Sequence, residues 1–519
     1  MVIYMTSEQR KKDLPKAIIQ WYDINKESRI ASIVAKKGNS VLIAEALEER
    51  GLNVTRLVLD VLEEKGPERE LPHAGQITAD WNNDEKTAWR ADGAYMQNQY
   101  NIIVAVGIFE YAKDPAVLLE CVRCLLKPDG KLLLAVDNRM GIRYFCGDQD
   151  FFTGKNFDSI ENYGHLRAWE QKGMEGRAYA KAEIRRYLEK AGFLKNRFFS
   201  VFPRIENPQI LLAEDYVPNE ALDIRIFPEY NNPDTVFLLE EELYHSLLEN
   251  GLFHGMANGF FIECPLSGEC TDINQVTLSG ERGIENALVT VIEKNGTVWK
   301  RMLYQEGRKK LQALFENNAY LSEHGVRMIE AELREDILVM PYITGIPANE
   351  YFKELFRKDK NAFLEKIDIF WDIIQHSSEP AQPEEIDWER FEPGWEKRKK
   401  DDPNKDKWKQ IAYGTEEERE TLGVILKRGY LDLVSLNCFY HEGRFLFYDQ
   451  ELYLENVPAK AIMLRTIEFI YEFNDQQNLI LPQRELFERY GMLKYMDLYH
   501  KFIGRFLNLL RDDDGLSDY

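Results

Sequence analysis

The sequence predicts an α/β protein, with an open, mostly parallel sheet in the first half of the chain and an α+β domain of two lobes after it. Three observations support this prediction. Short apolar strands alternate with helical stretches up to about residue 200, antiparallel hairpin patterns begin near residue 271, and amphipathic helices close the chain. We therefore expect an N-terminal extension, a first domain and the two lobes of a second domain over residues 1–27, 28–268, 269–345 and 346–519.

The composition is that of a folded protein with an acidic surface. The 519 residues are 44% hydrophobic and 12% aromatic, and 66 Lys+Arg against 88 Asp+Glu give a net charge of −22. Such a chain repels phosphate backbones, so we expect no nucleic-acid partner. Neither a secretory signal nor a membrane-spanning apolar run is visible. We expect a cytoplasmic protein, and a peripheral position at the inner face of the membrane stays open.

The elements of the first half follow from its apolar periodicity. A helix should begin at Ser40 and end at Gly51, and a second helix should begin at Asp114, because these residue types cap helix termini. The helices connect short apolar runs that we expect to be buried parallel strands, at Ile30–Ala35, Val54–Leu59, Ile102–Val106 and Leu132–Val136. Right-handed crossovers then place the carboxyl ends of these strands along one ligand-binding edge.

The stretch from Tyr100 to Phe145, YNIIVAVGIFEYAKDPAVLLECVRCLLKPDGKLLLAVDNRMGIRYF, resembles the second half of a class I S-adenosylmethionine-dependent methyltransferase. Downstream, YAKAEIRRYLEKAGF (Tyr179–Phe193) is similar to the late helix of that family. The resemblance implies a Rossmann-like fold, bound S-adenosylmethionine and methyl transfer. Similar domains occur with bacterial surface-polysaccharide enzymes, which implies a glycan or other hydroxyl-bearing acceptor and glycosyltransferases as partners.

The cofactor-binding positions depart from the family pattern. A glycine-rich turn after the first strand lets the backbone approach the cofactor, but only Gly38 keeps a glycine there. The second strand carries Val58 where an acidic residue is usual, with Asp60 two residues on. The resemblance therefore implies Gly38 and Asp60 as cofactor contacts, and Asp80 in the run ITADW as a contact to the adenine amino group.

Two interpretations of the first domain stay open. It is either a methyltransferase with an unusual cofactor pocket, or a methyltransferase fold that no longer binds S-adenosylmethionine and serves as a scaffold or acceptor-binding domain. Glu110 and Tyr111 lie just beyond the third strand, where they face the mouth of the pocket or serve in helix capping or the core.

The second domain begins with three antiparallel strands in the segment QVTLSGERGIENALVTVIEKNGTVWKRML, where Asn295-Gly296 marks a hairpin. Lys300 lies in the third of these strands, and a helix follows it. Glu316 borders the apolar face of that helix, where it is placed to pair with Lys300, and Glu306 is the alternative partner.

The segment LDLVSLNCFYHEGRFLFYDQEL (Leu431–Leu452) carries the strongest local signal. Asp432 and Asn437 have the D-x-x-x-x-N spacing of a kinase catalytic loop. A hairpin with its turn at Glu442-Gly443 pairs residues whose numbers sum to about 885, so Asn437 faces Tyr448. Asp449 is then the diagonal neighbour of Asn437, and an amide and a carboxylate come together as oxygen ligands for magnesium.

This segment resembles the protein-kinase and aminoglycoside-phosphotransferase superfamily. The resemblance implies that Asp432 orients the acceptor hydroxyl and that Asn437 and Asp449 hold Mg²⁺. It also implies that Lys300, supported by Glu316, holds the phosphates of ATP.

Two departures from the superfamily pattern accompany this resemblance. Tyr430 replaces the usual histidine, and Asp449-Gln450-Glu451 replaces Asp-Phe-Gly. Charged and proline-rich sequence at about 378–420 is expected to be a solvated insertion. The sequence as a whole thus predicts a bifunctional methyl- and phosphotransferase acting on a surface glycan; the alternative is a degenerate, non-catalytic or singly active scaffold in a glycan-assembly complex.

Overall fold

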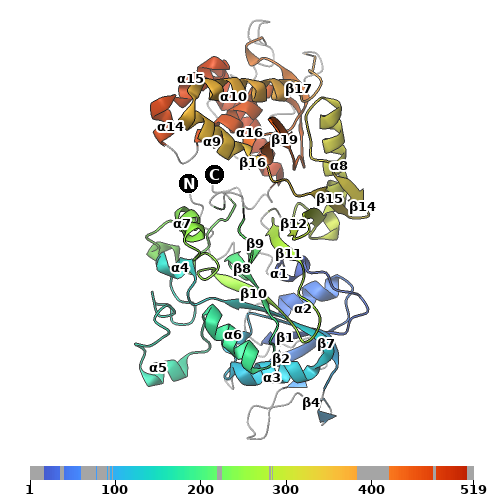
Figure 1. Ribbon diagram of the computed structural model, residues 1–519, viewed down its shortest axis with the longest axis vertical. Helices are drawn as coiled ribbons and strands as arrows, with labels where there is room; N and C mark the ends of the chain where they lie inside the picture. The colour runs from blue at the N-terminus through green and yellow to red at the C-terminus, as the bar shows by residue number, and fades with distance from the viewer. Residues whose placement is uncertain are drawn as a thin grey trace, which may run out of the picture. The chain divides into compact units, whose positions relative to one another are not determined.

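The computed structural model describes residues 17–35, 40–59, 77–78, 90–91, 94–95, 97–218, 222, 225–279, 282, 285–382, 420–471 and 475–510. The chain forms two compact units (Figure 1). The first comprises Met1–Gly280 with Ala287–Asn295, and the second comprises Glu281–Asn286 with Gly296–Tyr519. Each unit has a hydrophobic core of its own.

The first unit is built on a sheet with the strand order β12-β11-β9-β8-β10-β7-β6-β1-β2-β3. One part of the sheet is parallel: β1 (Ile30–Ala35), β2 (Val54–Leu59), β3 (Ile77–Thr78), β6 (Tyr100–Val106) and β7 (Leu126–Asp137). The other part is antiparallel: β8 (Arg197–Pro203), β9 (Pro208–Ala213), β10 (Gly259–Pro265), β11 (Ile273–Leu278) and β12 (Leu288–Glu293). A separate short pair is formed by β4 (Arg90–Ala91) and β5 (Ala94–Tyr95).

Helices cover both faces of the parallel strands, as the buried strands require. Two consecutive residues of β1 show this: Val34 packs with Ala44 of α2 (Ser40–Glu49), and Ile33 belongs to the larger core with Leu118 of α3 (Pro115–Leu125). Asp114 caps α3 by accepting the N–H of Ala116 at 2.9 Å, as the sequence predicts. The other helical segments of this unit are α1 (Ala17–Gln20), η2 (Phe109–Tyr111), α4 (Ile142–Phe145), α5 (Ala168–Gly173), α6 (Lys181–Lys190), η4 (Pro233–Thr235), η5 (Glu241–Leu243) and α7 (Tyr244–Glu249).

The order in which successive strands are placed in the sheet reverses at β1. Strand β1 pairs with β2 on one side and with β6 on the other, both in parallel, so that Ile30 lies opposite Val54 and Ile102. Where the connections from two neighbouring strands run in opposite directions, a crevice forms outside the carboxyl ends of those strands. The fold therefore provides a ligand-sized opening beyond the ends of β1 and β6.

The second unit combines short antiparallel sheets with helices. Its strands are β13 (Thr297–Met302), β14 (Glu332–Arg334), β15 (Ile337–Pro341), β16 (Ile346–Pro347), β17 (Ile425–Gly429), β18 (Cys438–His441), β19 (Arg444–Phe447) and β20 (Leu454–Pro458). Its helical segments are η7 (Gln305–Gly307), α8 (Arg308–Glu323), α9 (Ala348–Lys358), α10 (Lys360–Gln375), η10 (Ser435–Asn437), α13 (Ala459–Tyr471), α14 (Asp475–Ile480), α15 (Gln483–Arg489), η11 (Leu493–Tyr495) and α16 (Met496–Leu510).

The predicted hairpin register of the second unit is confirmed. Cys438 of β18 pairs with Phe447 of β19, so the residue numbers sum to 885, and the N–H of Tyr448 donates to the carbonyl of Asn437 at 3.1 Å. Glu442 and Gly443 both have positive φ, at 52° and 78°. This is the backbone of a two-residue type I′ turn, which fixes the register.

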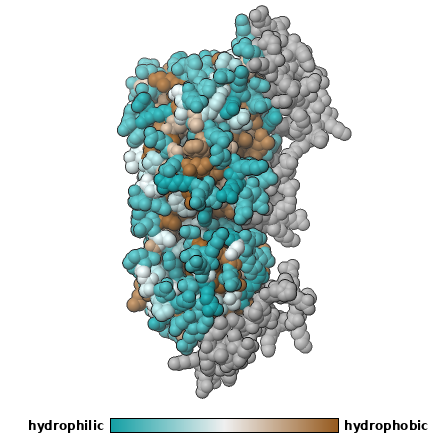
Figure 2. Space-filling model, turned by 90° about the vertical axis from the view of Figure 1, so that its right-hand side faces the viewer, coloured by the Kyte–Doolittle hydropathy of each residue, from teal (hydrophilic) through white to brown (hydrophobic). Residues whose placement is uncertain are grey.

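Hydrophilic residues prevail on the face of the molecule drawn in Figure 2, with hydrophobic residues between them in small groups. This agrees with the 30% of charged residues in the chain. Among the residues that the structure covers, none of the helices has both the length and the apolar character that a membrane span needs.

Candidate active site

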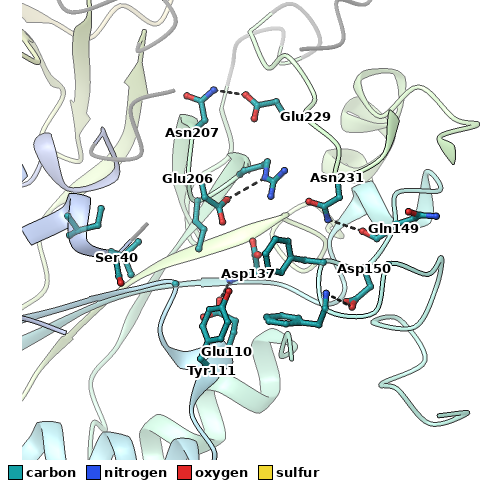
Figure 3. Close-up of a pocket in the computed structure, with 18 residues that line it drawn as sticks. Ser40, Glu110, Tyr111, Asp137, Gln149, Asp150, Glu206, Asn207, Glu229 and Asn231 are labelled. Carbon is teal, nitrogen blue, oxygen red and sulfur yellow. Dashed lines mark hydrogen bonds and ion pairs between the residues drawn. The ribbon is translucent and has the colours of Figure 1, made fainter. Parts of the chain in front are cut away.

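A pocket of about 500 Å³ lies in the first unit, at the carboxyl ends of the parallel strands (Figure 3). Gly107 follows β6, Asp137 ends β7, and Ser40 begins α2 after β1. The hydroxyl of Ser40 accepts the N–H of Ala35 at 2.9 Å and so ties the start of α2 to the end of β1. Residues 149–152 and the β8–β9 connection at 204–207 complete the wall. The pocket therefore occupies the crevice that the strand order creates.

Glu110, in the turn η2, contributes a carboxylate to the pocket, and one of its two oxygens makes no hydrogen bond to the described residues. Its side chain is only 4% exposed, and Oε1 accepts the N–H of Asp137 at 2.6 Å. Oε2 is buried and has no hydrogen-bond partner among the described residues. Burial, and next the charge of Asp137, raise the pKa of Glu110 to about 8.

Asp137 is held between this carboxylate and a buried cation. Oδ1 of Asp137 lies 3.6 Å from Nη2 of Arg143, a fully buried side chain, and Nε of Arg143 lies 3.8 Å from Oδ2 of Asp148. The hydroxyl of Tyr144 accepts a hydrogen bond from Nη2 at 2.7 Å. Burial raises the pKa of Asp137, and the charge of Arg143 opposes that rise. Arg143 therefore favours the ionised form of Asp137 at the pocket wall.

Three further carboxylates line the pocket, and each has a partner. Asp150 accepts the N–H groups of Phe152 and Thr153, both at 2.9 Å, and the hydroxyl of Tyr163 at 3.0 Å. The other two pairs are Glu206 with Arg204 at 3.4 Å, and Glu229 with the amide of Asn207 at 2.5 Å. Among the described residues, the lining thus has five carboxylates (Glu110, Asp137, Asp150, Glu206 and Glu229) and one guanidinium, that of Arg204.

The sequence identified part of this pocket. Glu110 and Tyr111 line it, in agreement with their expected place at its mouth. The predicted cofactor contacts Gly38, Asp60 and Asp80 lie outside the described residues. Asp137 was missed, although its place at the end of the apolar run LLLAVD was a usable signal. Asp150 and Glu206 had no such signal, because they come from connections far along the chain.

The comparisons with known proteins identify a domain family for the first part of the chain. Residues 18–195 match a family described as a methyltransferase domain, so this part of the chain carries such a domain. The match does not extend into the second unit. No curated protein matches the chain.

Several solved methyltransferase structures show a weak likeness to the chain. A chain of the complex between the Haloferax volcanii Trm112 methyltransferase activator and a methyltransferase is 13% identical, with a TM-score of 0.27, over 51% of this chain and 92% of that one. An S-adenosylmethionine-dependent methyltransferase from Mesorhizobium loti is 13% identical (TM-score 0.24; 48% and 95% covered), and one from Aquifex aeolicus is 12% identical (TM-score 0.21; 38% and 86% covered).

In the second unit, the predicted phosphotransfer residues form one cluster. Lys300 on β13, which is 6% exposed, pairs with the carboxylate of Asp449. The main-chain oxygen of Asp432 accepts the side-chain amides of Asn437 at 3.2 Å and Gln450 at 2.9 Å. The carboxylate of Asp432 lies 3.1 Å from Nη2 of a further residue, Arg465. The fold therefore brings β13, the 432–437 loop and the residues after β19 together.

Glu451 adds a carboxylate that the sequence did not single out. Oε2 lies 2.8 Å from Nη1 of Arg282. Burial raises the pKa of Glu451 to about 7, and the neighbouring carboxylate of Asp449 adds to the rise. The described residues contain no group of three or more His, Cys, Asp and Glu side chains that could hold a metal ion. The assignment of Asn437 and Asp449 as magnesium ligands stays a prediction.

The expected pairing of Glu316 with Lys300 is wrong in this structure. Glu316 is exposed and accepts the amide of Gln312 at 2.8 Å, whereas Lys300 pairs with Asp449. One residue further along α8 turns the side chain by about 100°, and Asn317 is the one that faces inward. Its Nδ2 donates to the carbonyls of Gln450 at 3.0 Å and Glu451 at 3.2 Å.

Proposed function

We propose that the first unit is an S-adenosylmethionine-dependent methyltransferase and that methyl transfer takes place in the pocket beyond β1, β6 and β7. The match of residues 18–195 to a methyltransferase domain supports this function. The observation that carries it is the position of the pocket, at the reversal of strand order within that same domain.

The residues of the pocket fit the cofactor. S-adenosylmethionine is a sulfonium with an ammonium group, and carboxylates such as Glu110 and Asp137 attract cations. Gly107 has a φ of 61° and a clear space where a Cβ would be, since the nearest atom there, Cδ1 of Ile205, is 3.9 Å away. When bound, the cofactor supplies an electrophilic methyl group. Gly38, Asp60 and Asp80 remain the proposed contacts to its nucleoside, from the family resemblance.

The chain's own residues have separate tasks in this proposal. Asp137, kept ionised by Arg143, orients a positive group at the end of β7. Glu110 offers Oε2 to a donor on the acceptor, and its raised pKa suits it to take up a proton near neutral pH. The walls formed by 149–152 and 204–207 limit the access of water.

Calorimetric titration of the full chain with S-adenosylhomocysteine and S-adenosylmethionine tests this function. We expect saturable binding of both, weakened about tenfold or more by Asp137→Asn. The exposed Glu120→Gln on α3 is the control and should bind as the unmodified chain does. An absence of binding at millimolar ligand would favour the alternative, a methyltransferase fold that serves as a scaffold.

A second activity, magnesium- and ATP-dependent phosphotransfer, is proposed for the second unit. The contact of Lys300 with Asp449, and of Asn437 with the backbone of Asp432, supports it. In this proposal Lys300 holds phosphates, Asn437 and Asp449 bind Mg²⁺, and Asp432 orients the acceptor hydroxyl. The acceptor suggested by the family resemblance is a cell-surface glycan, with glycosyltransferases as partners.

A further inference from the structure

The pocket of the first unit has a strongly negative lining. Among the described residues, its charged side chains are five carboxylates and a single guanidinium, and that guanidinium, on Arg204, is already paired with Glu206 at 3.4 Å. No lysine is among the described residues that line the pocket. A phosphate or carboxylate on an acceptor would therefore meet repulsion from these described side chains, whereas a cation would be attracted.

A second observation marks where such a group would bind. Glu110 is 96% buried, its side chain faces the pocket, and its Oε2 lacks a hydrogen-bond partner among the described residues. A buried carboxylate oxygen without a donor costs free energy, and a ligand that brings an N–H donor removes that cost. Oδ1 of Asp137 also lacks a hydrogen-bond partner among the described residues, but it lies 3.6 Å from the guanidinium of Arg143. The remaining pocket carboxylates, Asp150, Glu206 and Glu229, accept hydrogen bonds from groups of the protein itself.

We propose that the acceptor of the first unit carries a basic amine, that this amine binds at Glu110 among the pocket carboxylates, and that its nitrogen is the methylated atom. This inference rests on the proposed methyltransferase function and narrows the acceptor class. Among glycans, it selects those that contain an amino sugar over neutral or phosphorylated ones.

The chemistry balances with the groups available. The approaching ammonium favours the ionised form of Glu110, so the carboxyl group first releases to water the proton that it holds near neutral pH. The bound ammonium then gives one proton to this carboxylate, which exposes the nitrogen lone pair. The nitrogen then forms a bond to the methyl carbon while the carbon–sulfur bond of S-adenosylmethionine breaks with its electron pair on sulfur. The products are an N-methylated ammonium, neutral S-adenosylhomocysteine and protonated Glu110, which returns its proton to water.

Binding of three matched sugars to the full chain tests the inference without turnover. Glucosamine and glucose differ in charge but little in shape, and glucose 6-phosphate adds a negatively charged group. Each sugar is titrated in the presence of saturating S-adenosylhomocysteine. We expect glucosamine to bind at least tenfold more tightly than glucose, and glucose 6-phosphate to bind most weakly. With S-adenosylmethionine, mass spectrometry of the glucosamine product should place the methyl group on nitrogen.

Two variants locate the effect. Glu110→Gln should reduce the preference for glucosamine over glucose to about threefold or less, and the exposed Glu120→Gln should keep it. If Glu110→Gln fails to fold, Glu206→Gln serves instead, because it leaves Arg204 unpaired; the affinity for glucose 6-phosphate should then rise and that for glucosamine should fall.

The outcomes separate this inference from the function on which it rests. Failure of S-adenosylhomocysteine to bind overturns the methyltransferase assignment and, with it, the amine acceptor. Cofactor binding together with equal or tighter binding of glucose 6-phosphate, or with a methyl group found on oxygen, overturns the amine acceptor alone.

Discussion

Lys300 and Asp449 form an ion pair in the second unit although 149 positions separate them in the sequence. The side chains are 7% and 20% exposed, so water screens the pair only weakly. Such a pair contributes little net stability compared with apolar packing, but loss of one partner leaves a buried charge without compensation.

Removal of the charge of Lys300 should therefore destabilise the second unit. Lys300→Met should lower the free energy of unfolding by about 1–3 kcal/mol, because the partly buried carboxylate of Asp449 loses this cation. Urea unfolding of the full chain measures this loss. Lys358→Met is the matched control: it breaks an exposed pair with Glu354 and should cost less than about 1 kcal/mol. Equal losses in both variants would contradict the prediction.

Magnesium and ATP together should protect the second unit against thermal unfolding. At a ligand concentration a hundred times the Kd, the expected stabilisation is about 2.7 kcal/mol. Asp449→Asn should reduce it strongly, because a neutral amide replaces the charged carboxylate ligand of magnesium. Asparagine is the suitable substitution because residue 449 has a φ of 62°, which asparagine tolerates better than alanine.

The controls for nucleotide binding are internal to the experiment. ATP with a chelator should give no shift in Tm, and Lys358→Met should keep the full shift. An unmodified chain whose Tm does not change with millimolar magnesium and ATP would remove the phosphotransfer proposal while leaving the first unit's function intact.

Glu110 should make stability depend on pH. Its pKa is raised from 4.5 to about 8 by burial, so the folded chain binds one more proton than the unfolded chain between these values. The stabilisation is complete below the unfolded pKa and is lost as the pH rises through about 8, with a slope of at most about 1.4 kcal/mol per pH unit. Glu110→Gln should flatten this slope in urea unfolding measured from about pH 5 to 8. The prediction fails if both proteins show the same slope.

Gly147 and Gly154 offer a matched test of the loop that walls the pocket. Both have positive φ, at 108° and 66°, but a Cβ on Gly147 would lie 2.5 Å from a ring carbon of Phe237, whereas nothing lies within 4 Å of one on Gly154. Gly154→Ala should cost about 1–2 kcal/mol from the backbone alone. Gly147→Ala should cost more and also weaken the binding of S-adenosylhomocysteine. Similar losses of stability in both would contradict the role assigned to the Phe237 contact.

Local patterns predicted the elements well because each depends on neighbouring residues. The bounds of β1 and β2 agree with the apolar runs Ile30–Ala35 and Val54–Leu59, and the two-residue turn at Glu442-Gly443 fixed the pairing of Cys438 with Phe447. A two-residue turn allows a single pairing register for the two strands, so the position of the turn in the sequence determines that register.

Side-chain direction on a helix was harder to predict. Glu316 was chosen as the partner of Lys300 because it borders the apolar face of α8, yet the buried side chain is that of Asn317. An error of one residue turns the side chain by about a quarter of a circle. The pocket wall at 204–207 was beyond reach for another reason: only the pairing of β8 with β9 and β10 brings it to the end of β7.

The hydrogen bonds around Asn317 and Gln450 have a consequence for how a ligand would be received. The side-chain amide of Asn317 donates hydrogen bonds to the main-chain carbonyls of Gln450 and Glu451. The side-chain amide of Gln450 in turn donates to the carbonyls of Asp432 and Tyr448. The segment 449–451 is thus already ordered before a ligand binds, so binding carries no entropic cost for ordering it. When a ligand enters, the long, flexible side chain of Lys300 would change conformation instead, because it must break its ion pair with Asp449 to contact the ligand.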